Sequence, residues 1–209
     1  MELKIEWIVL LVGIAGEFLV PAILGRFYKK YHILRDGLGK LSNPKSPVQW
    51  FYRSWQVLSG GVMIVGGIAL WKLLGLWGLP LLVMLVIYGV LGRMGLGVMS
   101  VVDVYDVDWA PATVYRIFRF SGYFCLQFGV LVLSAYAFAF GPWVRVSRMA
   151  GALMLVSAVM GILAYALSRM SRRREFSGTI LQWQGLWELL SLLFLYLPLG
   201  VWSGWMLSL

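Results

Sequence analysis

Residues 5–25 read IEWIVLLVGIAGEFLVPAILG and lead directly into a basic stretch, residues 26–47, which reads RFYKKYHILRDGLGKLSNPKSP. An α-helix rises 1.5 Å per residue, so about 20 mostly apolar residues cross the hydrocarbon core of a bilayer. The first stretch has this length, and its only charged residues are Glu6 and Glu17. The pattern predicts a membrane-spanning helix that ends where the basic loop begins.

The composition of the whole chain agrees with this interpretation. Of its 209 residues, 61% are hydrophobic and 13% are charged, whereas an ordinary soluble domain carries about 25% charged residues. A water-soluble fold of this size cannot bury so much apolar surface. We therefore expect an all-α, polytopic integral membrane protein, with residues 1–209 forming a single domain. It should be a six-transmembrane-helix bundle with helices at about 5–25, 48–70, 74–97, 114–140, 150–168 and 179–203.

The spacing and composition of these blocks also predict how the helices contact one another. Only residues 71–73 separate the second block from the third, which predicts a tight antiparallel hairpin. Small residues allow close helix packing in membranes, where lipid supplies no hydrophobic drive between helices. A compact monomer and an oligomer interface explain the small residues of this chain equally well. Those in the predicted helices are Gly60, Gly61, Gly66, Gly67, Gly89, Gly92, Ser157 and Gly161.

The basic residues predict an orientation. Fourteen of the 18 Lys and Arg residues fall in or beside the loops that follow the first, third and fifth helices. Cytoplasmic loops retain Lys and Arg, whereas translocated loops are depleted of them. We therefore expect a multi-pass protein of the cell membrane with these three loops in the cytoplasm and both termini outside. Tryptophans near both ends of the helices, as at headgroup level, support the same threading: Trp7, Trp71, Trp77, Trp143, Trp202 and Trp205 outside, and Trp50, Trp55, Trp109, Trp183 and Trp187 inside.

The net charge of +9 does not indicate a nucleic-acid partner, because the basic residues flank apolar runs and form no single stripe. Membrane lipids, including anionic headgroups, are the expected partners. A membrane-protein partner or a second copy of the chain stays open as an alternative. No cofactor is expected.

Two carboxylates lie inside the apolar blocks. Glu17 and Glu188 sit at similar depth, roughly 12–14 Å from the predicted cytoplasmic boundary. Charge inside a spanning helix is costly and often functional. Because Gln184, Glu188 and Ser191 share one face of the last helix, we expect an intramembrane polar site made of these three residues and Glu17.

This polar site has two interpretations. In the first, the carboxylates form a pair that binds a proton, a cation or a polar headgroup. In the second, each glutamate stays protonated or pairs with an arginine as a structural element, the candidates being Arg93, Arg116 and Arg119. The sequence favours the structural interpretation, since ion pairs also occur in bundles.

Hydrolytic and metal chemistry have little support in the sequence. Asp103, Asp106 and Asp108 form an oxygen-rich cluster that suits hard cations, but without the spacing of a metal loop, so a solvated loop is the preferred interpretation. His32 is the only histidine and Cys125 the only cysteine. Catalytic zinc usually takes three protein ligands, which this pair cannot supply.

The most distinctive stretch is the loop after the first helix, LRDGLGKLSNPKSPVQWF at residues 34–51. It resembles the prokaryotic multi-pass membrane family known as domain of unknown function 998, which is related to the Frag1-like proteins. The segment GTILQWQGLW, residues 178–187, is similar to the last helix of that family. The resemblance implies a prokaryotic plasma-membrane protein of about six helices.

Kinship of that family to membrane hydrolases, including ceramidases, would imply a metal-dependent, amide-cleaving site. This chain departs from that pattern: Gly39 stands where the family tends to have Ser, Ser42 stands where it has Gly, and no histidine pair lies in a helix. Independently of the family, Pro44 and Pro47 stiffen a basic loop that either binds an anionic lipid or a partner, or serves as a surface connector. Its candidate contact residues are Arg35, Asp36, Asn43 and Lys45.

We carry three functional hypotheses from the sequence. The leading one is a non-enzymatic integral membrane protein, either a subunit of a membrane complex or a binder of lipid or a small solute, with its polar core at Glu17 and Glu188. The second is a proton- or cation-coupled transporter that uses these carboxylates. The third, a membrane-embedded hydrolase, is disfavoured because the chain has no metal-ligand set.

Overall fold

The computed structural model describes residues 2–99, 109–140, 147–171 and 178–208, and within these ranges it is all-helical, without a strand. A π-helix, η3 (Tyr88–Gly95), joins α3 directly to α4. Short 3-10 helices lie at Leu38–Ser42 (η1), Gly75–Gly78 (η2) and Ile180–Gln182 (η6). The α-helices are α1 (Glu2–Arg26), α2 (Gln49–Leu74), α3 (Leu79–Ile87), α4 (Leu96–Val98), α5 (Trp109–Phe140), α6 (Arg148–Met170) and α7 (Gln184–Ser208).

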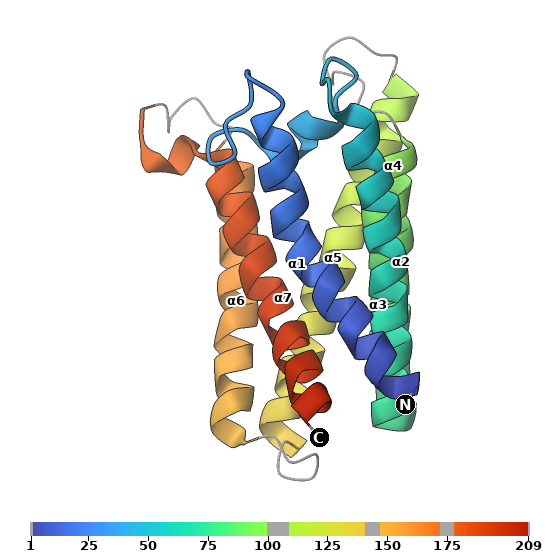
Figure 1. Ribbon diagram of the computed structural model, residues 1–209. Coiled ribbons are helices and arrows are strands. Elements are labelled where there is room, and N and C mark those ends of the chain that lie inside the picture. Colours follow the sequence, from blue (N-terminus) through green and yellow to red (C-terminus); the bar gives the residue numbers. More distant parts are fainter. Residues whose placement is uncertain (1, 100–108, 141–146, 172–177, 209) are drawn as a thin grey trace.

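The long helices lie alongside one another in an elongated bundle (Figure 1). Both termini lie at one end, which we call the terminal end, and the loop after α1 lies at the other, which we call the loop end (Figure 1). α1 packs between α2 and α7, while α6 packs against α5 and α7. η3 lies between α2 and α5, so its side chains reach the middle of the bundle.

Within the described residues, five stretches are long and apolar enough to cross a membrane: Lys4–Arg26, Gln49–Val98, Thr113–Phe140, Arg148–Met170 and Gln184–Ser208. The second is 50 residues long and reverses direction at Gly75, whose φ of 60° favours glycine. After this turn, α3, η3 and α4 pack back along α2. The chain therefore folds back where the sequence predicts a hairpin, but the turn lies at Gly75–Gly78 and not at 71–73.

The predicted bounds of the last helix, 179–203, are wrong at both ends. α7 begins at Gln184 and continues to Ser208. Gly178 has a φ of 85° and Thr179 is extended, so a turn and the short helix η6 precede α7. An apolar run alone does not reveal this interruption, because the short helix η6 contains apolar residues such as Ile180.

The third predicted helix, 74–97, is also irregular. Its second half is the π-helix η3, in which three of eight residues are glycine. Glycine weakens the preference for the α-helix, and π-helical turns are often found at functional sites. Here the π-helix carries Arg93 into the interior, where the arginine is 2% exposed.

Glycines allow η3 to approach its neighbours closely. A Cβ atom on Gly60 of α2 would lie 2.5 Å from the carbonyl oxygen of Gly89, and one on Gly122 of α5 would lie 2.3 Å from Cα of Gly92. Ser157 of α6 donates a hydrogen bond of 2.7 Å to a backbone carbonyl of α7. Gly60, Gly122 and Ser157 therefore make close contacts between helices of the chain.

Two of the tryptophans assigned to the outer belt face the interior instead. Trp7 and Trp202 are each 1% exposed and belong to the hydrophobic core. Trp50 and Trp77, by contrast, are 71% and 69% exposed, as residues of an aromatic belt should be. Sequence position gives the level of a tryptophan along a helix but not the face on which it lies.

Candidate functional site

Glu17 forms a buried ion pair with Arg93. Nη2 of Arg93 lies 2.5 Å from one carboxylate oxygen of Glu17 and 2.6 Å from the other. Nε of the same guanidinium donates to the Ser59 hydroxyl at 2.9 Å. The pair thus ties α1 to η3, and Ser59 adds α2 to the network.

Glu188 forms a second ion pair nearer the loop end. Nη2 of Arg119, on α5, lies 2.8 Å from Oε1 of Glu188, and the same oxygen accepts from the Gln184 amide at 2.7 Å. Its other oxygen, Oε2, accepts from the backbone N–H of Leu38 at 2.8 Å. This carboxylate therefore joins α7 to α5 and also holds the loop after α1.

The two pairs belong to one polar layer lined by tyrosines. Tyr52 and Tyr123 each lie within electrostatic range of both ion pairs. The hydroxyl groups of Tyr88 and Tyr196 are 2.6 Å apart. The layer thus connects α2, α5, α7 and the π-helix across the bundle interior.

The predicted site is brought together only in part: Gln184 contacts Glu188, whereas Glu17 and Ser191 have other partners. Glu17 pairs with Arg93 and Glu188 with Arg119, so each glutamate has its own arginine. Ser191 donates to the Gly161 carbonyl at 2.9 Å, so it braces α7 against α6. Arg116 lies on the exposed side of α5. This arrangement matches the structural interpretation of the glutamates.

A buried ion pair is costly to desolvate, but losing one partner is costlier still, because the other charge is left uncompensated. Both oxygens of Glu17 accept from the Arg93 guanidinium. Glu188 accepts from the Arg119 guanidinium, the Gln184 amide and the Leu38 N–H. The layer keeps two glutamate carboxylates paired with two guanidinium groups, and these pairs fix the relative positions of α1, η3, α5 and α7.

The loop after α1 packs onto the start of α7. The N–H of Leu186 donates to the carbonyl of Leu34 at 2.8 Å. A Cβ atom on Gly185 would lie 2.1 Å from the carbonyl oxygen of Ile33, so only glycine fits there without a shift of the backbone. The two segments that carry the family resemblance, 34–51 and 178–187, are therefore neighbours in space.

Within this loop, the polar side chains mainly stabilise the loop itself. Asp36 forms an ion pair of 2.9 Å with Lys40 and accepts from the backbone N–H of His32 at 2.8 Å. Asn43 accepts from the N–H of Lys45 at 2.8 Å, which closes a local turn. Burial raises the pKa of the Tyr31 hydroxyl well above its usual value, so this phenol stays neutral at physiological pH.

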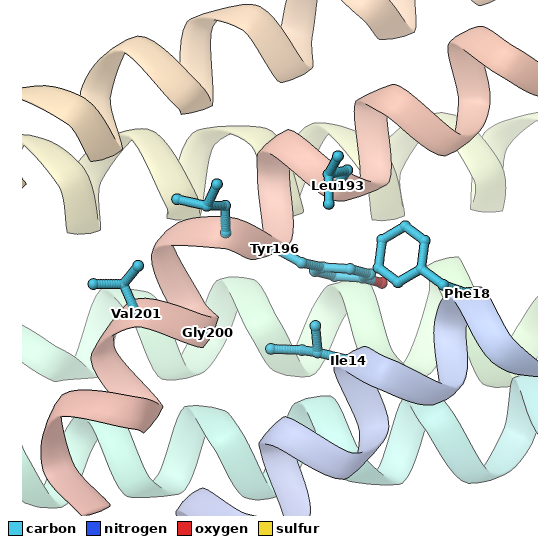
Figure 2. Close-up of a pocket in the computed structure, with 7 residues that line it drawn as sticks. Ile14, Phe18, Leu193, Tyr196, Gly200 and Val201 are labelled. Atoms are coloured by element: carbon cyan, nitrogen blue, oxygen red, sulfur yellow. The ribbon is translucent and has the colours of Figure 1, made fainter. Parts of the chain in front are cut away.

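A shallow apolar groove that was not predicted from the sequence lies between α1 and α7. Its volume is about 300 Å³. Figure 2 shows Tyr196 reaching from α7 toward Phe18 of α1, and the two rings meet edge to face at 6.5 Å between centroids. Gly200 forms part of the wall and leaves open space where a side chain would stand. The lining residues are Ile14, Phe18, Leu193, Tyr196, Leu197, Gly200 and Val201.

One sequence signal could have pointed to this groove. Gly200 and Gly204 are spaced four residues apart on α7, and a Cβ atom on either would meet nothing within 4 Å. Small residues with that spacing mark faces on which another group approaches closely. The groove itself depends on how α1 crosses α7, which local sequence does not encode.

The candidate metal ligands Asp103, Asp106 and Asp108 lie outside the described residues. Within the described ranges, no three His, Cys, Asp or Glu side chains are grouped so as to hold a metal ion.

Fold and site together define an all-helical protein whose helices are long and apolar enough for a membrane and whose interior holds two arginine–glutamate pairs. Comparison with known proteins found no matching family model, no matching curated protein and no matching solved structure. The resemblance to the domain of unknown function 998 family stays a prediction.

Proposed function

We propose that this chain is a non-enzymatic, multi-pass integral membrane protein that binds a membrane lipid, with an acyl chain of the lipid in the groove between α1 and α7. It crosses the bilayer six times, because α2 and the α3–η3–α4 limb form two antiparallel crossings. The loop end lies in the cytoplasm and both termini lie outside. The fourteen basic residues assigned to one side support this orientation.

The groove is the observation that carries the lipid assignment. Leu193 lies nine residues beyond the start of α7, which places it roughly 14 Å from the loop end. At that depth the surrounding solvent is the acyl region of a bilayer whose core is about 30 Å thick. Leu193, Leu197 and Val201 are spaced four residues apart and are 40–46% exposed, so they present one apolar wall to an acyl chain.

The polar layer supports a binding role over a proton-coupled carrier. A proton-coupled carrier needs a carboxylate that gains and loses its proton or exchanges a cation during transport. Glu17 is instead bound through both oxygens by Arg93, and Glu188 by Arg119, the Gln184 amide and the Leu38 N–H. This favours structural glutamates over transport carboxylates.

Filling the groove tests the proposal. In Gly200→Leu, the new side chain enters open space beside the groove and should displace a bound lipid. The matched control is Gly204→Leu, which also enters open space but does not line the groove. Both variants should fold, since replacing a helical glycine removes a helix penalty of up to about 1 kcal/mol. Lipids retained after gentle detergent purification are measured by native mass spectrometry.

We expect Gly200→Leu to lose the retained lipid and Gly204→Leu to keep it. Equal lipid retention in the two variants and the parent chain would contradict the proposal. If both variants instead lost a stoichiometric protein partner or a dimer, the glycine face would be a helix-docking surface, and the subunit hypothesis would replace lipid binding.

A further inference from the structure

A second recess opens at the loop end, between the loop after α1 and the turn before α7. Its volume is about 530 Å³, within the range of small-molecule sites. Arg35 and Asp36 line one side, and Thr179, Ile180, Gln182 and Trp183 line the other. The recess therefore lies where the docked loop meets the segment that leads into α7.

The loop segment around this recess carries a net positive charge. Asp36 is occupied by Lys40 and by the N–H of His32. Arg35 is exposed and has no carboxylate within ion-pair distance in the described part of the chain. Residues 26–45 carry six Lys and Arg side chains against one carboxylate, so the field around Arg35 attracts anions.

We propose that this recess binds the phosphate group of an anionic membrane lipid, with Arg35 as its main ligand. This inference rests on the lipid-binding function proposed above and names the headgroup chemistry. The planar guanidinium fork matches phosphate oxygens in a bidentate geometry that lysine cannot reproduce. The hydroxyl of Thr179 and the amide of Gln182 give the opposite wall a polar character suited to a headgroup.

The apolar residues of the recess place it at headgroup level. Ile180 is 62% exposed on a turn directly beside a basic pocket. Trp183 lines the same pocket one residue before α7 begins, and tryptophan rings favour the level between headgroups and acyl chains. An exposed isoleucine and a tryptophan next to an arginine therefore suit the membrane surface better than open water.

The recess and the groove also match the dimensions of one lipid. The groove joins α1 to α7, the recess joins the loop after α1 to the segment before α7, and Leu193 lies nine residues, or roughly 14 Å of helix, beyond Gln184. Half of a hydrocarbon core about 30 Å thick has nearly the same length. A phosphate at Arg35 therefore leaves the acyl chains of that lipid long enough to reach the groove.

The test measures binding of two lipid probes, dioleoyl phosphatidylglycerol and dioleoyl phosphatidylcholine, to the full chain in detergent by native mass spectrometry. Arg35→Gln removes the proposed ligand, and Arg35→Lys keeps the charge but not the fork. Arg26→Gln is the matched control, because it removes an exposed guanidinium from the same basic segment outside the recess. Glycerol 3-phosphate is titrated as a competitor to represent a soluble phosphate source.

We expect Arg35→Gln to lower the affinity for phosphatidylglycerol about fivefold or more, the effect of one basic residue at a membrane surface. Arg35→Lys should recover only part of this loss, and Arg26→Gln should cause little. Affinity for phosphatidylcholine should change least. Because Arg35 is exposed, the melting temperature of these variants should equal that of the parent chain.

Equal losses in Arg35→Gln and Arg26→Gln would overturn the inference, since they would show diffuse attraction and no built site. If glycerol 3-phosphate displaces phosphatidylglycerol at a concentration comparable to that of the lipid, the recess binds phosphate but the phosphate does not need to come from a lipid. The result for Gly200→Leu is independent of these outcomes. If Arg35→Gln loses the preference for phosphatidylglycerol while Gly200→Leu keeps its retained lipid, the phosphate site stands and the groove is rejected as the acyl-chain site.

Discussion

Glu17 on α1 and Arg93 on η3 form an ion pair inside the bundle, with Nη2 of Arg93 at 2.5 and 2.6 Å from the two carboxylate oxygens. Glu17 is 1% exposed and Arg93 is 2% exposed, so water screens neither charge. The guanidinium also holds Ser59 on α2. Three crossings of the proposed bundle therefore meet at one fixed charge pair.

Replacing Glu17 by Gln should destabilise the protein strongly. It leaves the Arg93 charge buried without compensation, which costs about 3–5 kcal/mol of unfolding free energy. The double variant Glu17→Met with Arg93→Met should recover most of this loss, because no unpaired charge remains. Thermal unfolding of the purified protein in one detergent measures both effects.

The pair between Glu6 and Lys72 provides the control for this experiment. Its atoms lie 2.7 Å apart, but its side chains are 19% and 43% exposed. Glu6→Gln should therefore cost less than about 1 kcal/mol. A Glu17→Gln variant that melts like the parent chain but loses a bound ion or solute would instead assign Glu17 to a transport site.

The sequence predicts the helices well because their signals are local. Length and hydropathy locate each apolar block, and the short connection between the second and third blocks predicts the reversal found at Gly75. The π-helix η3 and the turn before α7 are not predicted, because apolar residues continue through both. In η3 the glycines pack against neighbouring helices, and before α7 the positive φ of Gly178 marks the turn.

The polar site is predicted only in part. Glu17, Glu188 and two of the three candidate arginines can be recognised because charge is rare in apolar helices. Which arginine pairs with which glutamate depends on how the helices cross. The contact from Leu38 to Glu188 uses a backbone N–H, which leaves no mark in the sequence. The α1–α7 groove and the recess at Arg35 are likewise products of tertiary packing.

Replacing Glu188 by Gln should loosen the loop after α1. The change removes the negative charge that accepts from Leu38 and from Arg119, so the loop loses its anchor in the bundle. Charge-assisted hydrogen bonds contribute about 1.5–3 kcal/mol, which predicts a tenfold or greater rise in the hydrogen-exchange rate of Leu38 and its neighbours.

Ser191→Ala is the matched control for the loop experiment. Ser191 lies on the same helix face as Glu188, but its hydroxyl bonds to the Gly161 carbonyl and does not touch the loop. It should leave exchange in residues 34–42 unchanged. Equal hydrogen-exchange rates of the loop in the two variants would mean that Glu188 does not anchor the loop.

Gly60→Ala should destabilise the bundle much more than Gly61→Ala. A Cβ atom at Gly60 would lie 2.5 Å from the backbone oxygen of Gly89, so α2 and η3 would have to move apart. At Gly61 the nearest atom is the end of the Met94 side chain at 3.7 Å, an ordinary contact. We expect a loss of about 1–3 kcal/mol for Gly60→Ala and no loss for Gly61→Ala, measured by thermal unfolding. Similar melting temperatures for the two variants would place the close approach of α2 and η3 in doubt.

Cysteine labelling on intact cells should reveal opposite orientations for the two ends of the bundle. With the native cysteine removed by Cys125→Ala, a Lys29→Cys variant places a thiol in the exposed basic loop, and a Leu76→Cys variant places one at the 85% exposed turn at the terminal end. Because the basic loop is proposed to be cytoplasmic, a membrane-impermeant maleimide should label Leu76→Cys and spare Lys29→Cys until the cells are permeabilised. The Leu76→Cys signal controls for expression and reagent activity. Ready labelling of Lys29→Cys on intact cells would reverse the orientation and place the Arg35 recess on the outer surface of the membrane.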